Sequence, residues 1–154
     1  MAEPRKRDAF ELAVVAISSR ERTVEELRGW LADREVPSEE VEEVIDRLIS
    51  IGELDDERYA QRYAEDKREL RGWGPERIRE ALISRGVDRT LAERAAGGED
   101  AETQAERAAD LLARRNDELG DDSGRSRALA YLARRGYDYE IAYRAVRLAA
   151  ARAA

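Results

Sequence analysis

Two stretches of this chain, residues 74–95 and 124–145, carry the same pattern fifty positions apart. Each begins with a glycine, continues with apolar residues at helical spacing, and reaches the order Arg-Gly-X-Asp at residues 85–88 and 135–138. A looser copy, displaced by fifty-one positions, begins at Thr23. A period of this length is typical of a supersecondary unit repeated in series. We therefore expect tandem units and an elongated molecule instead of one compact domain.

The composition favours helices throughout. Long runs of Ala, Leu, Glu and Arg are interrupted by only three prolines and ten glycines, which predicts an all-α fold of tandem three-helix repeats. We expect a lone N-terminal helix within residues 1–20, a first repeat at 21–70 and a second at 71–120. The third repeat, at 121–154, is expected to be truncated to two helices.

Several residues predict where helices begin and end. Thr23, followed three residues later by Glu26, has the pattern of a capping box. Pro75 lies at the favoured first position of a helix, and Gly86 is suited to the left-handed conformation that closes one. Residues 120–124 are short and polar, so they are expected to form a hinge loop before the next helix.

The residue types exclude most catalytic chemistry. The chain has no cysteine and no histidine, so disulfides, the usual zinc ligand sets and imidazole acids or bases are all excluded. Paired carboxylates such as Asp55 and Asp56 lie at expected helix starts, where the helix dipole accounts for them. The Gly72 and Gly74 pair lacks the spacing and the lysine of a phosphate loop. We expect no enzymatic activity, no cofactor and no metal site.

The expected location is the cytoplasm, with no membrane contact and a monomeric state. No segment approaches the roughly 20 apolar residues that span a bilayer, and the N-terminal residues lead into no signal-peptide core.

Charge is distributed unevenly along the chain. Residues 1–70 carry 12 basic and 20 acidic groups, residues 71–120 carry 9 and 11, and residues 121–154 carry 7 and 4. Such asymmetry indicates that the C-terminal units face an anionic partner, whereas the N-terminal unit faces solvent or a basic surface.

Arginines that recur in the repeat, or lie beside the recurring ones, are the candidate partner-binding residues. Those that precede a closing glycine have an equally good structural explanation, because arginine near a helix C-terminus satisfies the last carbonyls. That explanation fits the ones in first helical turns less well, since positive charge is mildly unfavourable there. The candidates are Arg77 and Arg127 in first turns, Arg85 and Arg135 before glycines, Arg144 with its counterpart Arg94, and Arg134.

Aromatic residues gather in the last unit beside these arginines. Tyr139 and Tyr143 are candidate binding residues, since planar and cationic groups interleave on nucleic-acid surfaces and at protein hot spots. Tyr137 takes the place of Val87 in the preceding copy, so it is expected in the core. Trp73 is expected either to cover a helix junction or to anchor a partner.

Three segments together resemble the RecX family of bacterial recombination regulators: residues 52–60 (GELDDERYA), 71–78 (RGWGPERI) and 131–138 (YLARRGYD). The resemblance extends over about residues 10–148. It implies tandem three-helix units in a curved, elongated molecule that binds the groove of the RecA–DNA filament. It further implies inhibition of ATP hydrolysis, strand exchange and co-protease activity, and hence a role in DNA repair, recombination and the SOS response.

The net charge of −7 departs from that of a mainly DNA-binding protein. We therefore expect protein contacts with RecA to dominate, with only weak contact with single- or double-stranded DNA. The alternative function is a helix-turn-helix-like DNA-binding module in residues 121–154. A further alternative is a helical scaffold whose charges are only a solvated face.

Overall fold

The computed structural model describes residues 8–154, which form nine α-helices and no strand. Residues 1–7, part of the expected N-terminal segment, lie outside the described range. The helices are α1 (Ala9–Ser19), α2 (Val24–Asp33), α3 (Ser38–Ser50), α4 (Asp56–Arg71), α5 (Pro75–Ser84), α6 (Arg89–Ala96), α7 (Ala101–Ala113), α8 (Asp122–Arg135) and α9 (Tyr139–Ala153).

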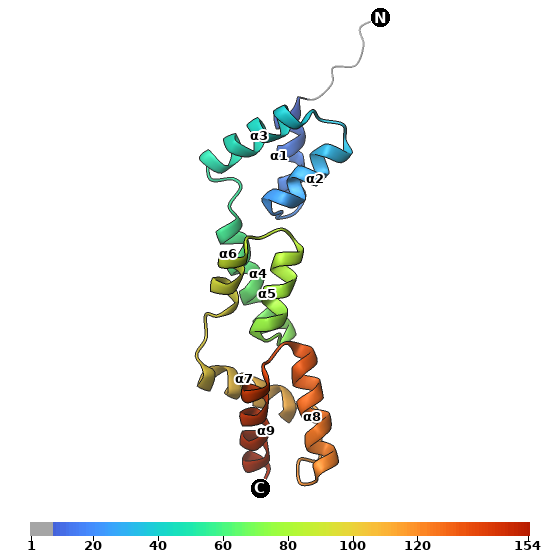
Figure 1. Ribbon diagram of the computed structural model, residues 1–154, viewed down its shortest axis with the longest axis vertical. Coiled ribbons are helices and arrows are strands. Elements are labelled where there is room, and N and C mark those ends of the chain that lie inside the picture. Colours follow the sequence, from blue (N-terminus) through green and yellow to red (C-terminus); the bar gives the residue numbers. More distant parts are fainter. Residues whose placement is uncertain (1–7) are drawn as a thin grey trace, which may run out of the picture.

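The helices pack into three successive units of three, stacked along the long axis of the molecule (Figure 1). Each unit has its own core. The first is built around Leu27, Leu31, Ile45 and Leu48, the second around Ile78, Leu82 and Val87, and the third around Ala108, Leu112, Leu132 and Ala145. The all-α tandem fold expected from the repeat is confirmed.

The grouping of helices differs from the expected division by one helix. α1 does not stand alone, because Ala13 and Ala16 are buried in the same core as α2 and α3. The third unit is not truncated either, since α7 contributes Ala105, Ala108 and Leu112 to the core it shares with α8 and α9. A periodic pattern fixes the length of a repeat, whereas side-chain packing decides which three consecutive helices share a core.

Helix starts follow the expected capping chemistry. The Thr23 hydroxyl accepts a hydrogen bond from the Glu26 amide at 3.0 Å, and Glu26 Oε1 accepts one from the Thr23 amide at 3.1 Å, completing the capping box. Pro75 opens α5, and Gly86 has φ of +91°. Side-chain oxygens of Asp55 and Asp121 cap α4 and α8.

The prediction of a loop over residues 120–124 is wrong for residues 122–124. α8 begins at Asp122, and the Gly124 amide donates to Asp121 Oδ1 at 2.6 Å. Gly124 is buried and packs closely against the backbone of Glu118. A Cβ at this position would therefore collide with the Glu118 carbonyl. The glycine therefore serves close packing inside the first turn of a helix.

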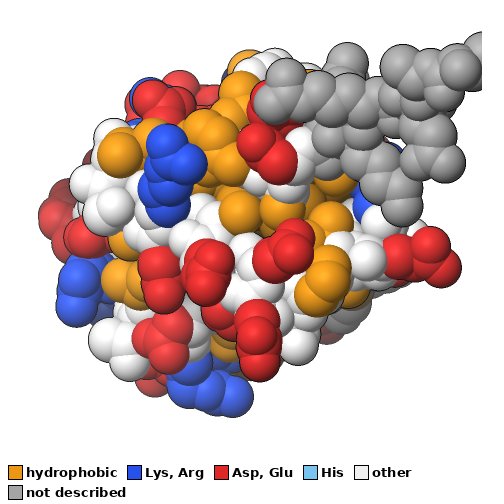
Figure 2. Space-filling model, turned by 90° about the horizontal axis from the view of Figure 1, so that it is seen from above, with side chains coloured by type: hydrophobic (Ala, Val, Ile, Leu, Met, Phe, Trp, Pro, Cys, Tyr) orange, Lys and Arg blue, Asp and Glu red, His pale blue; other side chains and the backbone are white. Residues whose placement is uncertain are grey.

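Carboxylate side chains are spread over the end of the molecule formed by the first unit, with hydrophobic side chains exposed between them (Figure 2). Val14, Val15, Ile49 and Ile51 are exposed in this unit. None of the helices in the described part of the chain combines the length and the apolar character needed to cross a bilayer.

Candidate partner-binding surface

The first two units meet at a joint formed by the start of α2 and the turn between α5 and α6. The Thr23 hydroxyl, fully buried, donates to the Arg85 carbonyl at 2.7 Å. The Val24 amide donates to Asp56 Oδ1 at 2.9 Å, and burial raises the pKa of this carboxyl. The Arg85 guanidinium bonds the Tyr59 hydroxyl at 3.3 Å and pairs with Glu26 at 3.5 Å.

The second and third units meet at a corresponding joint, formed by the start of α5 and the turn between α8 and α9. The Gly74 amide donates to the Arg135 carbonyl at 2.7 Å, and the Glu76 amide donates to the Gly136 carbonyl at 3.0 Å. Arg77 Nη1 also donates to the Arg134 carbonyl at 3.3 Å. Carbonyls of the next unit thus satisfy N–H groups that the first turn of a helix leaves unpaired.

A left-handed glycine allows the close approach at both joints. Gly86 and Gly136 have φ of +91° and +98°, a conformation that other residues rarely adopt. A Cβ at Gly86 would collide with the Glu25 side chain, and one at Gly136 with Arg77. The recurring Arg-Gly pair of the sequence therefore forms the surface by which one unit docks on the unit before it.

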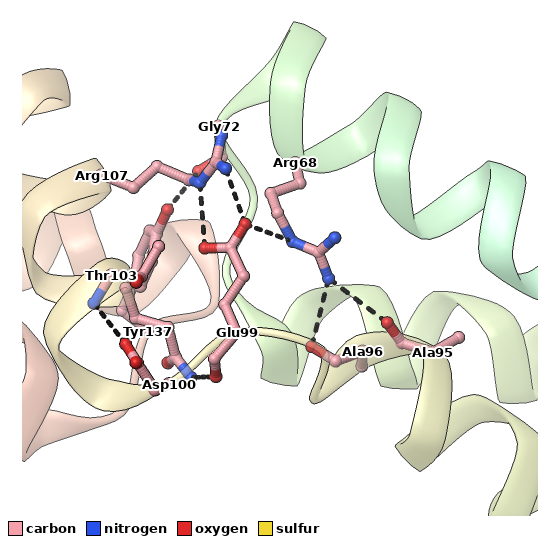
Figure 3. Close-up of polar contacts among 10 residues, drawn as sticks. Arg68, Gly72, Ala95, Ala96, Glu99, Asp100, Thr103, Arg107 and Tyr137 are labelled. Atoms are coloured by element: carbon pink, nitrogen blue, oxygen red, sulfur yellow. Dashed lines mark hydrogen bonds and ion pairs between the residues drawn. The ribbon is translucent and has the colours of Figure 1, made fainter.

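A partly buried polar network ties α4 and α6 to the third unit at the second joint (Figure 3). Glu99 Oε1 lies 3.3 Å from Arg68 Nε and 2.6 Å from Arg107 Nη2, and Arg68 Nη2 donates to the Ala95 carbonyl at 3.2 Å. The Tyr137 hydroxyl donates to the Gly72 carbonyl at 3.2 Å. Burial raises the pKa of Tyr137 to about 12, so it remains a donor at neutral pH. The core position predicted for Tyr137 is confirmed.

The joints hold three of the predicted binding residues. Arg85 is half-buried at the first joint, and Arg135 is half-buried at the second, where its Nη1 donates to the Arg71 carbonyl at 2.8 Å. The Arg77 guanidinium lies over the Trp73 ring, 4.1 Å from the centroid, in addition to its bond to Arg134. These arginines have intramolecular contacts that account for them without a partner.

The other predicted residues are exposed on α8 and α9. Arg127, Arg134 and Arg144 are exposed, and the one hydrogen bond of the Arg127 guanidinium within residues 8–154 goes to the Ser123 hydroxyl, at 2.9 Å. Tyr139 and Tyr143 are 71% and 48% exposed and stack on one another, with ring centroids 6.2 Å apart. The structure thus brings the two tyrosines together and leaves their outer faces open to solvent.

A groove of about 280 Å³ between α8 and α9 extends this exposed face. Tyr143 and Leu129 line it together with Arg125 and Arg147. The Arg147 guanidinium lies 6.0 Å from the Tyr143 ring centroid, and Arg125 Nε donates to the Leu119 carbonyl at 2.7 Å. The groove therefore combines an aromatic wall with two cations.

Sequence reasoning did not single out Arg68, Glu99 and Arg107, because none of them recurs in the repeat. It left two alternatives for Trp73, and the structure places this residue partly buried, edge to face with Tyr63 at a centroid distance of 6.4 Å. Nowhere in residues 8–154 do three or more metal-ligating side chains gather closely enough to hold an ion.

Replacing Thr23 with valine is expected to lower the free energy of unfolding by about 1–3 kcal/mol. The shape is kept, but the Glu26 amide and the Arg85 carbonyl lose their hydroxyl partner at a buried site. Urea unfolding measures the change, with Thr90→Val as the control because Thr90 is exposed in the first turn of α6. Equal losses in both variants would contradict this role of the hydroxyl.

Comparison with known proteins agrees with this architecture. Residues 9–48 match the first three-helix domain of RecX, and residues 55–95 match the second. These ranges follow α1–α3 and α4–α6, the helix groups that share cores.

Relatives with the name "Regulatory protein RecX" align over nearly the whole chain. The protein from Mycobacterium avium is 34% identical over 92% of this chain and 84% of its own length. The protein from Deinococcus radiodurans is 36% identical over 94% of this chain and 70% of its own. The crystal structure of RecX from Lactobacillus salivarius shares the fold, with a TM-score of 0.82 at 23% identity, covering 91% of this chain and 93% of that one. This chain belongs to the RecX family of regulatory proteins.

Proposed function

We propose that this chain binds the RecA–DNA filament and inhibits its recombinase activities, namely ATP hydrolysis, strand exchange and co-protease activity. Membership of a family of regulatory proteins supports a protein partner. The role in DNA repair and recombination, and a location in the cytoplasm, belong to the same proposal.

The observation that carries the proposal is the exposed face of α8 and α9. Tyrosine and arginine are the residue types that dominate binding hot spots, and here stacked Tyr139 and Tyr143 lie on the same helix as Arg144 and Arg147. None of these four side chains forms an ion pair or a hydrogen bond among the described residues, although the Arg147 guanidinium lies 6.0 Å from the centroid of the Tyr143 ring. They are free to bind a partner surface.

The joints hold the units at a fixed spacing, which binding to a filament also requires. A helical filament presents equivalent surfaces at regular intervals, and a serial molecule can contact more than one of them if its units keep their relative orientation. The hydrogen bonds that the Arg85 and Arg135 carbonyls accept, from the Thr23 hydroxyl and the Gly74 amide, keep that orientation. We place the principal contact on the third unit, with the acidic first unit more peripheral.

The double variant Arg127→Glu with Arg144→Glu is expected to raise the inhibitory concentration about tenfold or more, since two exposed cations become anions without disturbing a joint. The measurement is ATP turnover by recombinase filaments on single-stranded DNA. The matched control is Arg47→Glu with Arg89→Glu, at exposed positions outside the third unit where neither side chain forms an ion pair among the described residues, and it keeps wild-type potency.

Equal potency of the two double variants would contradict the placement of the contact on α8 and α9. The alternative function, a DNA-binding module in the same helices, predicts a different result. In that case the wild-type chain binds DNA tightly without recombinase, and the Arg127 and Arg144 changes abolish that binding.

A further inference from the structure

A second basic site lies away from that face, where α4, α7 and α8 meet. A hollow of about 360 Å³ is lined by six arginines and only two carboxylates, Glu69 and Asp110. We call it the arginine hollow. Its arginines are Arg68, Arg71, Arg107, Arg114, Arg115 and Arg135.

Part of this charge is already neutralised. Glu99 pairs with Arg68 and Arg107, and Asp117 pairs with Arg115 at 3.0 Å. Arg152, which lies outside the hollow, forms an ion pair with Asp110 at 2.9 Å.

Arg71 and Arg114 have no carboxylate within 4.0 Å among the described residues, and both are exposed. Two unpaired guanidinium groups therefore share the opening of the hollow.

The usual structural explanation for these arginines does not hold. Arginine at the end of a helix commonly satisfies its last carbonyls, and both residues lie at helix ends, Arg71 in α4 and Arg114 at the cap of α7. At α4, however, the Arg71 carbonyl already accepts from Arg135 and the Gly72 carbonyl from Tyr137. Neither the Arg71 nor the Arg114 guanidinium has a hydrogen bond within the described part of the chain.

A second hollow continues from the first along α4. It measures about 350 Å³, shares Leu70 and Arg71 with the arginine hollow, and is further lined by two cations, Lys67 and Arg85, and one carboxylate, Asp66. Tyr59 and Tyr63 form its aromatic side and stack with centroids 6.0 Å apart.

The two hollows span the face of α4 from Tyr59 to Arg71. At about 1.5 Å of rise per residue, this length is roughly 18 Å. The basic face thus runs from the first joint of the molecule to the second.

We propose that this face binds the phosphate backbone of a nucleic-acid strand, with the arginine hollow as its principal phosphate site. Guanidinium groups form paired hydrogen bonds with phosphate oxygens. A length of roughly 18 Å corresponds to about five phosphates at the ~3.4 Å rise per nucleotide of one strand in B-form DNA. Open, connected hollows fit a continuous strand better than a free nucleotide, which requires an enclosed site.

This site goes beyond the proposed function, because it lies on α4 and α7 and requires no recombinase. It is also consistent with the net charge of −7. Twenty of the 35 carboxylates fall in residues 1–70, and few of them line these hollows.

The test is fluorescence anisotropy of a labelled single-stranded oligonucleotide across a salt series, without recombinase. The full chain is compared with Arg71→Glu plus Arg114→Glu, and with the control pair Arg47→Glu plus Arg89→Glu, whose residues line neither hollow. The first double variant is expected to bind about tenfold or more weakly, with a log–log salt slope shallower by about one to two units. The control pair is expected to keep most of the wild-type affinity and most of the wild-type salt slope.

Circular dichroism and thermal unfolding establish that each variant is folded. Arg71→Gln plus Arg114→Gln is a second pair that removes charge without adding repulsion, and it should show the same direction of change. Wild-type affinity and slope in both folded hollow variants would overturn the proposal.

Equilibrium dialysis with a nucleoside triphosphate forms the second arm. Nucleotide binding that needs Arg71 and Arg114, combined with unchanged oligonucleotide binding, would also overturn the strand assignment. These binding assays contain no recombinase. A negative result in them therefore does not bear on inhibition of the filament, and a lack of inhibition would not bear on the binding result.

Discussion

Replacing Leu132 with alanine is expected to lower the free energy of unfolding by about 2–5 kcal/mol. Leu132 is fully buried in the core of the third unit, between α7, α8 and α9. Truncation removes the transfer free energy of the lost methyl groups and leaves a cavity, which a core of small alanines cannot easily fill by side-chain movement. Leu82, at the same repeat position in the second unit, is equally buried and should show a loss of the same size.

Urea unfolding followed by circular dichroism measures these changes. Leu70→Ala is the matched control, since Leu70 is 78% exposed and its truncation creates no cavity. A loss below about 1 kcal/mol for Leu132→Ala, comparable to that of the control, would show that the third unit is not packed as described.

The second large effect is expected from Gly74→Ala, which places a methyl group inside the joint between the second and third units. The added Cβ would lie 2.6 Å from the carbonyl carbon and oxygen of Gly136 and 2.8 Å from the Tyr137 amide nitrogen. These are backbone atoms, so the joint must open to relieve the clash. We expect a stability loss of about 1–3 kcal/mol and weaker coupling of the two units.

Small-angle X-ray scattering should detect this change as a broader distribution of interatomic distances, with helix content unchanged. Gly29→Ala is the matched control, because nothing lies within 4 Å of a Cβ at that position of α2. Its scattering should equal that of wild type, and its stability should rise slightly, since alanine favours helix over glycine. An unchanged scattering profile for Gly74→Ala would contradict the close joint.

The helices could largely be predicted from sequence because their signals are local. Apolar spacing, the Thr23 cap and Pro75 at a helix start act within a few residues, and the structure bears them out. The assignment of helices to cores could not be predicted, because a fifty-residue period is the same whichever helix is counted first. The prediction that Gly124 lies in a loop was wrong for a related reason, because this glycine allows a close tertiary contact with the Glu118 carbonyl.

The candidate surface was predicted only in part. Recurrence singled out Arg85 and Arg135 as candidate binding residues, but recurrence in register marks any contact that the units share, and here the shared contact is the joint between them. Tyr139 differs from Arg89, its counterpart in the preceding copy, and it is strongly exposed. The arginine hollow is assembled from Arg71 and Arg114, which are distant in sequence and meet only because the joint brings α4 beside α7.

We propose that this chain inhibits the RecA filament. The most direct measurement is ATP turnover by filaments on single-stranded DNA as the chain is added, with co-sedimentation of the chain in the same samples. The account predicts that turnover falls as the chain accumulates with the filament. Unchanged turnover, together with a chain that stays in the supernatant, would contradict it.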